Sequence, residues 1–387
     1  MWVGAGMKIR RKLADACRTL LLAASVTALS AGLARPQDLQ ALNNDILENP
    51  SDSELSLRYA RAAEETGKWR LALAAYERVL INDPENDEAR RGYERMRRRI
   101  EPGCTTIFAE FCVRWYSNPV NLPAFEEEDF SVFANATLIN ERPFADRRWR
   151  SIINFEGEVV EEFDQVNNMY VGAQTGPLLY VGPHLAAIPS VGVAAATLGN
   201  EYYFSEANVG VTVEGHRNGL SYWGRLRGGW RDYSDDSVAE DGTYAELVGG
   251  ISIPRITSES DVIVLVPWAR LSDIEGSTFN FLSGGDVTPG EYVEYGIEAT
   301  YKNQVNDHLL LSIGATARER YYEQTVSFLG PEREDSYFAP EVSATVLNML
   351  PCDCGVRLSY QHRDNSSNDP AADFDGDQVS LSLLTRW

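Results

Sequence analysis

The sequence has 387 residues, a formal net charge of −22 at pH 7 and a hydrophobic share of 44%. This strongly negative charge argues against nucleic acid as a partner. The lack of an apolar run of about 20 residues argues against a helical-bundle membrane protein. The length leaves room for two domains, one of them large.

The first 34 residues have the pattern of an export signal. Basic residues in Lys8–Lys12 precede the apolar stretch Leu20–Ala34, which is rich in small residues. This order is typical of a secretory signal peptide, with cleavage expected after Ser30 or Ala34. Export places the mature chain in a disulfide-permissive compartment, which in a Gram-negative cell is the periplasm or the outer membrane.

Residues 35–101 are expected to form a small helical module in the periplasm. The run GKWRLALAAYERVLINDP resembles the second helix of a tetratricopeptide repeat, and Pro50 and Pro84 are one such period of 34 residues apart. The expected helices are 37–48, 53–66, 69–82 and 86–100. The residues expected to pack them are Gly67, Trp69, Ala72, Tyr76, Leu80 and Pro84. The module is interpreted either as a peptide-binding or docking module, or as a structural cap on the barrel.

Residues 102–128 are interpreted as a linker, because they contain prolines, two cysteines and an acidic run. Four cysteines remain after cleavage: Cys104, Cys112, Cys352 and Cys354. Our hypothesis is that Cys104 and Cys112 bridge to Cys352 and Cys354 and so clamp the helical module under the barrel. A Cys104–Cys112 bridge and a four-thiol metal site are the alternatives.

Residues 129–387 read as the strands of a transmembrane antiparallel β-barrel. In the segment VRLSYQ, for example, Val356, Leu358 and Tyr360 alternate with polar residues, which is expected where one face meets lipid and the other the lumen. Thirteen strands are expected, at 129–138, 149–161, 168–181, 186–197, 200–214, 219–232, 243–253, 261–271, 291–303, 307–321, 336–348, 354–363 and 376–387. Because bacterial single-chain barrels have an even number of strands, we expect one further strand between 104 and 200, which makes fourteen, with twelve as the alternative.

Charged residues on the polar faces are expected to line the lumen. The candidates are Arg225, Arg227, Glu294, Glu298, Arg318 and Arg357. They form either a conduit for a polar chain or the salt-bridged filling of a narrow barrel. The sequence contains no recognisable catalytic set, so we expect neither an enzyme nor a cofactor or metal site.

The chain closes on the strand Gly376–Trp387. Its apolar face carries Val379, Leu381, Leu383 and Trp387. An alternating strand with a terminal aromatic residue suits recognition by the barrel-insertion machinery. We therefore expect an outer-membrane protein in contact with lipid and lipopolysaccharide.

The segment from Arg357, RLSYQHRDNSSNDPAADFDGDQVSLSLLTRW, resembles the ending of the surface lipoprotein assembly modifier (Slam) family. A signal peptide, tetratricopeptide helices and a C-terminal barrel are also that family's layout. The resemblance implies a non-enzymatic outer-membrane translocon whose partner is a secreted or lipidated client protein. A polysaccharide-exporting or porin-like barrel and a structural protein with a plugged barrel are the competing interpretations.

Overall fold

The computed structural model describes residues 39–386 apart from 50–51, 101–102, 124–126, 145–146, 183, 218, 235–238, 275–289, 326–329 and 351–353. The expected signal peptide lies outside the described residues. The chain divides into two compact units, Met1–Glu101 and Pro102–Trp387. The described part of the first unit is helical, and the second is a β-barrel.

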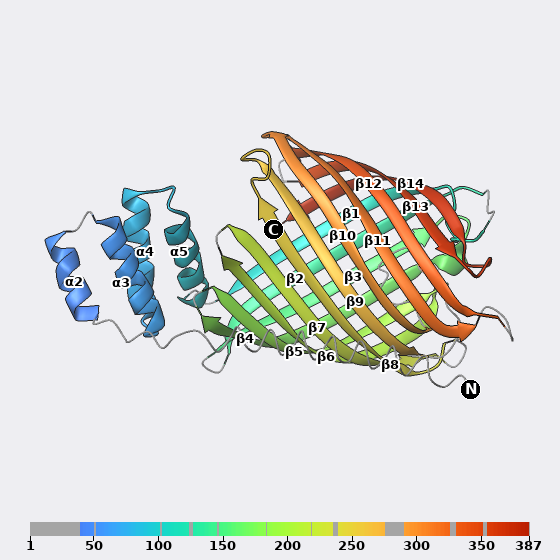
Figure 1. Ribbon diagram of the computed structural model, residues 1–387, viewed down its shortest axis with the longest axis horizontal. Coiled ribbons are helices and arrows are strands. Elements are labelled where there is room, and N and C mark those ends of the chain that lie inside the picture. Colours follow the sequence, from blue (N-terminus) through green and yellow to red (C-terminus); the bar gives the residue numbers. More distant parts are fainter. Residues whose placement is uncertain are drawn as a thin grey trace. The chain divides into compact units, whose positions relative to one another are not determined.

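Four helices form the described part of the first unit, as predicted (Figure 1). They are α2 (Leu39–Glu48), α3 (Ser53–Glu65), α4 (Trp69–Asn82) and α5 (Asp87–Ile100). The carboxylate of Asp52 caps α3 by accepting a hydrogen bond from the backbone N–H of Leu55 at 3.0 Å. None of the described helices is both long and apolar enough to cross a membrane.

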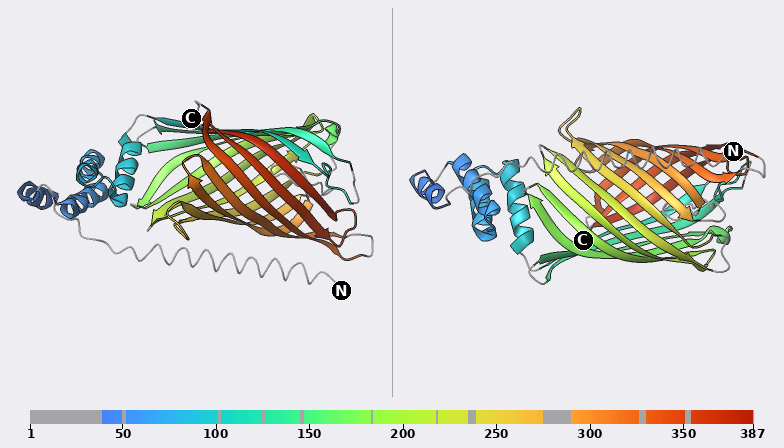
Figure 2. Two further views of the ribbon diagram at one scale, coloured as in Figure 1. Left: turned by 90° about the horizontal axis from the view of Figure 1, so that it is seen from above. Right: turned by 60° about the horizontal axis from the view of Figure 1, so that its bottom comes forward.

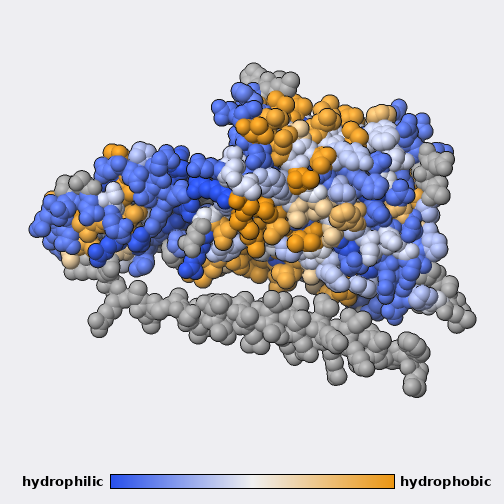
Figure 3. Space-filling model, turned by 45° about the horizontal axis from the view of Figure 1, so that its top comes forward, coloured by the Kyte–Doolittle hydropathy of each residue, from blue (hydrophilic) through white to orange (hydrophobic). Residues whose placement is uncertain are grey.

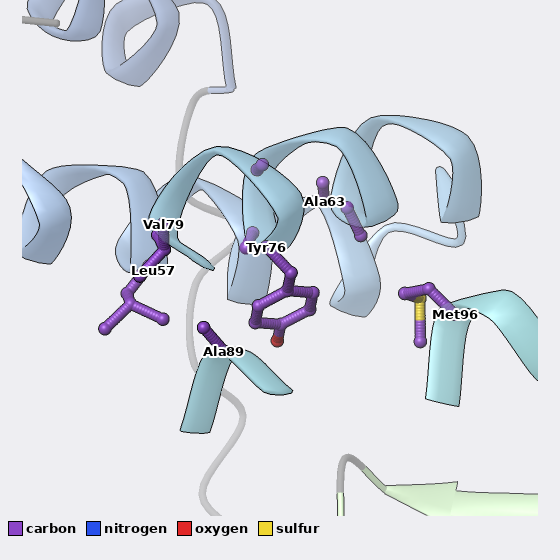
Figure 4. Packing of buried hydrophobic residues seen from close by; sticks show 9 residues of the cluster. Leu57, Ala63, Tyr76, Val79, Ala89 and Met96 are labelled. Carbon is purple, nitrogen blue, oxygen red and sulfur yellow. The ribbon is translucent and has the colours of Figure 1, made fainter. Parts of the chain in front are cut away.

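Tyr76 lies at the centre of the helical core (Figure 4). Its side chain is 1% exposed and packs among Leu57, Val79, Ala89 and Met96. A Cβ atom at Gly92 would lie 2.3 Å from the Tyr76 ring, so α5 approaches α4 this closely only because position 92 is a glycine.

A buried polar network accompanies this core. Glu64 accepts hydrogen bonds from the Tyr76 hydroxyl at 2.9 Å and from Arg95 Nη2 at 2.9 Å. Burial, together with the neighbouring Glu64 carboxylate, raises the pKa of Tyr76 well above its ordinary value, which keeps the hydroxyl protonated as a donor. The network therefore ties α3, α4 and α5 together without an orphaned charge.

The predicted packing residues of the module have different surroundings. Ala72 and Tyr76 are buried, while Trp69 and Leu80 are partly buried against the same core. Gly67 has a φ of 75° in the turn between α3 and α4, a conformation that favours glycine. Pro84 is exposed beyond the end of α4. The assignment to the tetratricopeptide class stays a prediction.

The second unit is a closed barrel of antiparallel strands (Figures 1 and 2). The strands are β1 (Cys104–Tyr116), β2 (Asp129–Phe144), β3 (Arg147–Val160), β4 (Asn168–Gly182), β5 (Leu185–Leu198), β6 (Glu201–Arg217), β7 (Leu220–Tyr233), β8 (Gly242–Pro254), β9 (Asp261–Ile274), β10 (Gly290–Asn306), β11 (Leu309–Thr325), β12 (Glu332–Leu350), β13 (Cys354–Ser367) and β14 (Phe374–Arg386). The fourteen strands confirm the preferred prediction.

Each strand pairs with its neighbours in the sequence, and β1 pairs with β14 to close the wall. The closing register runs from Phe108↔Arg386 to Tyr116↔Gln378. Closure matters because an open edge would leave unpaired backbone N–H and C=O groups, which lipid cannot satisfy.

The predicted linker at 102–128 is wrong for its first half, because β1 occupies Cys104–Tyr116. This is the strand missing from the predicted thirteen, and the barrel therefore begins before residue 129. Its alternation is blurred because the inward-facing Cys112 and Tyr116 are apolar or aromatic and fully buried. A polar inward face is expected of a water-filled lumen, and the lumen beside these residues is packed.

The predicted disulfide clamp is also wrong. Cys104 and Cys112 are both free cysteines. They belong to the barrel wall rather than to a mobile linker, and Cys112 pairs in register with Phe133 and Ser382 in mid-strand. Its place on the wall is therefore set by the backbone pairing of β1 with β2 and β14. Cys352 lies outside the described residues.

The two ends of the barrel differ in their connections. We call the end where β1 begins and β14 ends the near end, and the opposite end the far end. Near-end connections such as 218–219 and 307–308 are short, whereas far-end connections include 117–128 and 275–289. Short turns at one end and longer loops at the other are typical of outer-membrane barrels.

The outer surface of the barrel is apolar. Figure 3 shows hydrophobic side chains gathered over the barrel wall. Among them, Leu381 and Leu358 are 55% and 56% exposed, and Val379 and Leu383 are each 37% exposed. This much exposed aliphatic surface is expected where a barrel meets hydrocarbon. Trp387 lies outside the described residues, so its role in barrel assembly stays a prediction.

We expect a Leu358→Lys substitution to destabilise the barrel by about 2 kcal/mol or more, because a lysine would then face hydrocarbon. Ser359→Lys is the matched control, since the next residue along the strand faces the lumen. Urea titration of the protein folded in lipid vesicles measures both. Equal losses for the two variants would contradict the assignment of the outer face.

Candidate functional site

The interior of the barrel contains all six predicted lumen residues. Strand registers place Arg227 beside Glu246 and Glu294 beside Arg320, on the face opposite to exposed residues such as Leu226. The same alternation places Arg225, Glu298, Arg318 and Arg357 on the inward face. The lumen is therefore the part of the molecule where charged side chains converge.

A ladder of ion pairs crosses five adjacent strands in the far half of the lumen. Glu246 on β8 contacts Arg225 Nη2 at 2.9 Å, Arg227 Nη2 at 3.4 Å and Arg270 Nη2 at 2.8 Å. Arg270 on β9 also contacts Glu294 on β10 at 3.2 Å. Each of these two carboxylates is thus shared among several guanidinium groups.

Glu294 has the most partners in this ladder. Its carboxylate accepts hydrogen bonds from Trp268 Nε1 at 2.8 Å and from Arg320 Nε at 2.7 Å. Arg318 lies farther away, with Nε 3.9 Å from Glu294, and donates to Asn365 on β13 at 3.3 Å. We call the seven residues Arg225, Arg227, Glu246, Arg270, Glu294, Arg318 and Arg320 the arginine–glutamate ladder.

The ladder is largely withdrawn from water. Glu246, Glu294 and Arg320 are 1%, 2% and 0% exposed. Such charges are tolerated only where hydrogen bonds and opposite charges replace their hydration, so removal of one partner is costly. The ladder is therefore a rigid ionic element of the wall.

A second network continues around the far half. Glu206 on β6 accepts hydrogen bonds from Arg231 Nε at 2.9 Å and from the Tyr244 hydroxyl. The Arg231 guanidinium lies over the Tyr244 ring, 4.6 Å from its centroid. Phe204 and Tyr233 pack beside it, with ring centroids 5.3 Å apart. Aromatic faces thus cover the cation on the sides that carboxylates leave open.

A third network connects β1, β2 and β3. Glu158 accepts from Arg114 Nη1 at 3.0 Å, from the Tyr116 hydroxyl at 2.6 Å and from Ser131 Oγ at 2.6 Å. Arg363 on β13 donates to Asn121 Oδ1, in the connection after β1, at 2.9 Å. Together the three networks line the far half with buried polar side chains that are joined by ion pairs and hydrogen bonds.

The near half of the lumen is hollow by contrast. A cavity of about 370 Å³ lies against the inward faces of β10 to β14. Glu298, Lys302, Glu341, Arg357 and Gln361 line it together with serine and threonine hydroxyls. Arg357 Nη2 is anchored by Glu110 on β1 at 2.6 Å, a contact that spans β14.

The predicted residues divide between these two regions. Arg225, Arg227, Glu294 and Arg318 belong to the ladder, whereas Glu298 and Arg357 line the cavity. Sequence reasoning missed Glu246, which joins the first two arginines to the rest. Strand parity around Leu247 contained the signal, because Glu246 alternates with exposed Leu247 on β8.

Chemically, the two halves suit different tasks. The ladder and its neighbouring networks hold fixed charges in mutual contact, which suits structural rigidity and control of passage. The near-half cavity presents charged and hydroxyl groups to its interior, which suits contact with a polar cargo.

The sequence matches no established protein-family model and no curated protein. Solved structures with similarity to this chain include the outer membrane channel DcaP of Acinetobacter baumannii, with 8% identity, a TM-score of 0.43 and coverage of 74% of this chain and 97% of that one. The outer membrane protein OmpT of Vibrio cholerae has 9% identity and a TM-score of 0.40 over 74% of this chain and 100% of that one. An outer membrane channel from Pseudomonas putida F1 has 11% identity and a TM-score of 0.40 over 74% and 97%. The resemblance to the Slam family stays a prediction.

Proposed function

We propose that this protein is an outer-membrane transport barrel that helps secreted or lipidated proteins reach the cell surface. The carrying observation is the division of the lumen into a packed far half and a hollow, polar near half. The near end is also where the chain passes from α5, ending at Ile100, into β1, beginning at Cys104. A helical module joined to the chain at this end supports a role in receiving cargo on the periplasmic side.

Passage through such a barrel requires the ion-paired side chains of the far half to move apart. The buried side chains of the three far-half networks then hold the lumen shut in the resting barrel. This gating keeps the outer membrane sealed to small solutes between transport events.

The test is quantitative surface proteomics of a strain lacking this protein. We expect surface-exposed lipoproteins or secreted proteins to fall, to recover with the full-length chain, and to stay low with a chain lacking residues 35–101 behind its signal peptide. A surface proteome and secretome unchanged by the deletion would contradict the proposal.

A channel for small polar solutes is the second candidate. The near-half cavity favours it, because about 370 Å³ is the size of a small-molecule site rather than of a path for a folded domain. Steady conductance of the unmodified protein in planar bilayers, with an unchanged surface proteome in the deletion strain, would favour this second function over the first.

A further inference from the structure

The near-half cavity contains charged side chains that the protein itself does not neutralise. Within the described part of the chain, Glu341 and Lys302 make no hydrogen bond or ion pair, and Glu298 accepts only one bond, from Thr300 Oγ1 at 3.3 Å. Arg357 pairs with Glu110 through Nη2 at 2.6 Å, so Lys302 is the cation here that has no carboxylate partner among the described residues. This contrasts with the far half, where Glu294 alone contacts three arginines.

The strand registers order these charges along the barrel. Inward residues form successive rungs, each about 6.6 Å from the next. Counting from the far side of the cavity toward the near end, Glu298 stands on the first rung, beside Thr316. Glu341 stands on the second, level with Thr300, Gly314 and Gln361.

The cations follow on the next two rungs. Lys302 stands on the third rung, level with Ser312 and Ser343. Arg357 stands on the fourth, beside Thr345. The cavity is therefore polarised, with carboxylates at its deep side and cations toward the near end.

Only small residues lie between the two carboxylates. Glu298 on β10 and Glu341 on β12 flank β11, where Gly314 and Thr316 face the cavity. A Cβ at Gly314 would lie 2.8 Å from the carbonyl oxygen of Ala299, so only glycine fits there without strain. Between the two carboxylates, β11 therefore presents only the backbone of Gly314 and the short side chain of Thr316.

We infer that this cavity is a binding site for a short zwitterionic peptide segment in extended conformation. Its ammonium group contacts Glu298 and Glu341, and its carboxylate contacts Lys302 and Arg357. Two to three extended residues span roughly 7 to 10 Å, which matches one to two rungs. The peptide backbone then forms hydrogen bonds with serine and threonine hydroxyls and with Gln361.

The polarity argues against simpler ligands. An inorganic anion finds the two cations but meets the carboxylates on the adjacent rung, and a lone cation has the converse difficulty. Only a ligand with both charges, separated by several ångströms, uses every group in the cavity. The inference deepens the proposed transport role and rests on it only for the source of the segment. That source is either a client protein, in which a lysine and an acidic side chain two residues apart supply the two charges, or a free peptide, whose termini supply them.

The binding test is calorimetric titration of the full-length protein, folded in detergent micelles, with three probes. These are trialanine, N-acetyl-trialanine, which lacks the positive charge, and trialanine amide, which lacks the negative charge. We expect trialanine to bind about tenfold more tightly than either capped form, because each cap removes one set of charge-assisted contacts. Equal binding of the three probes, or binding of none, would overturn the inference.

Variants identify the groups. Glu341→Gln is expected to weaken trialanine about fivefold or more and to leave N-acetyl-trialanine unchanged, whereas Lys302→Gln should weaken both. Because neither side chain has a partner within the described part of the chain, both variants should fold to the unmodified level, which heat-dependent gel mobility checks. Glu319→Gln, on the outward face of β11, removes the same charge outside the lumen and should bind as the unmodified protein does. Weakening by Glu319→Gln equal to that by Glu341→Gln would contradict the site.

Glu341→Gln also distinguishes between client proteins and free peptides as the source of the segment. If client proteins supply the segment, a strain carrying Glu341→Gln shows fewer surface lipoproteins or secreted proteins. If free peptides supply it, the surface proteome stays unchanged and uptake of trialanine falls. A deletion strain with unchanged surface proteins removes the proposed function but leaves the calorimetric result standing.

Discussion

A Glu294→Gln substitution is expected to destabilise the barrel by about 3–5 kcal/mol, the cost of breaking a buried ion pair by removing one partner. The carboxylate contacts Arg270, Arg318 and Arg320, and the side chain of Arg320 is fully buried. A neutral amide would leave these guanidinium groups repelling each other in a site with little access to water. Urea titration in vesicles, followed by tryptophan fluorescence, measures the loss, and Trp268 reports locally because it donates to Glu294.

Glu298→Gln is the matched control for this result. Glu298 lies on the same strand and the same inward face, four residues away, but it is exposed. Among the described residues it accepts a single hydrogen bond, from Thr300 at 3.3 Å. We expect its replacement to change the free energy of unfolding by less than about 0.5 kcal/mol. Equal effects at the two positions would mean that the ladder is not the stabilising element described above.

A Gly176→Ala substitution should have a comparably large effect, about 3 kcal/mol, through the backbone rather than through charge. A Cβ atom at position 176 would lie 1.9 Å from the carbonyl oxygen of Pro189 on β5. Backbone atoms cannot rotate away as a side chain does, so β4 and β5 would have to separate. The backbone pairing between β4 and β5 is already interrupted between the pairs Thr175↔Val191 and Leu179↔Ala187.

Gly224→Ala on β7 tests whether the effect is specific. The nearest atom to a Cβ there is the Val248 carbonyl oxygen at 3.8 Å, an ordinary contact. We expect little change in the midpoint of urea unfolding for this variant and a clear fall for Gly176→Ala. Similar midpoints for both would show that β4 and β5 have more freedom at Pro189 than the register indicates.

Most of the wall could be predicted from local alternation. Thirteen of the strands follow from segments such as VRLSYQ, in which exposed Leu358 alternates with inward Arg357. Lipid on one side and a polar lumen on the other impose this two-residue period directly on the sequence. The inward placement of Glu294 and Arg318 follows from the same rule.

The strand β1 was not predicted from the sequence, because the lumen beside it is packed with side chains rather than filled with water. The strand β1 carries Cys112 and Tyr116 inward. Both are buried, and the Tyr116 hydroxyl donates to Glu158 on β3. Nothing local to β1 indicates this, because Arg363 and Glu158, which surround Tyr116, are distant in the sequence. The cysteines suggested a linker, and only closure of β1 against β14 shows that they belong to the wall.

The strand periodicity, the helices of the N-terminal module and the inward direction of the predicted charged residues could all be predicted from the sequence. These are local properties, set by hydrogen-bonding geometry and by which solvent each face meets. Which charges meet depends on the tertiary structure: Glu246 joins three arginines from β7 and β9, while Glu341 and Lys302 have no ion-pair partner among the described residues. Ion pairing depends on strand register and barrel closure, because these bring side chains from different strands to the same height in the lumen.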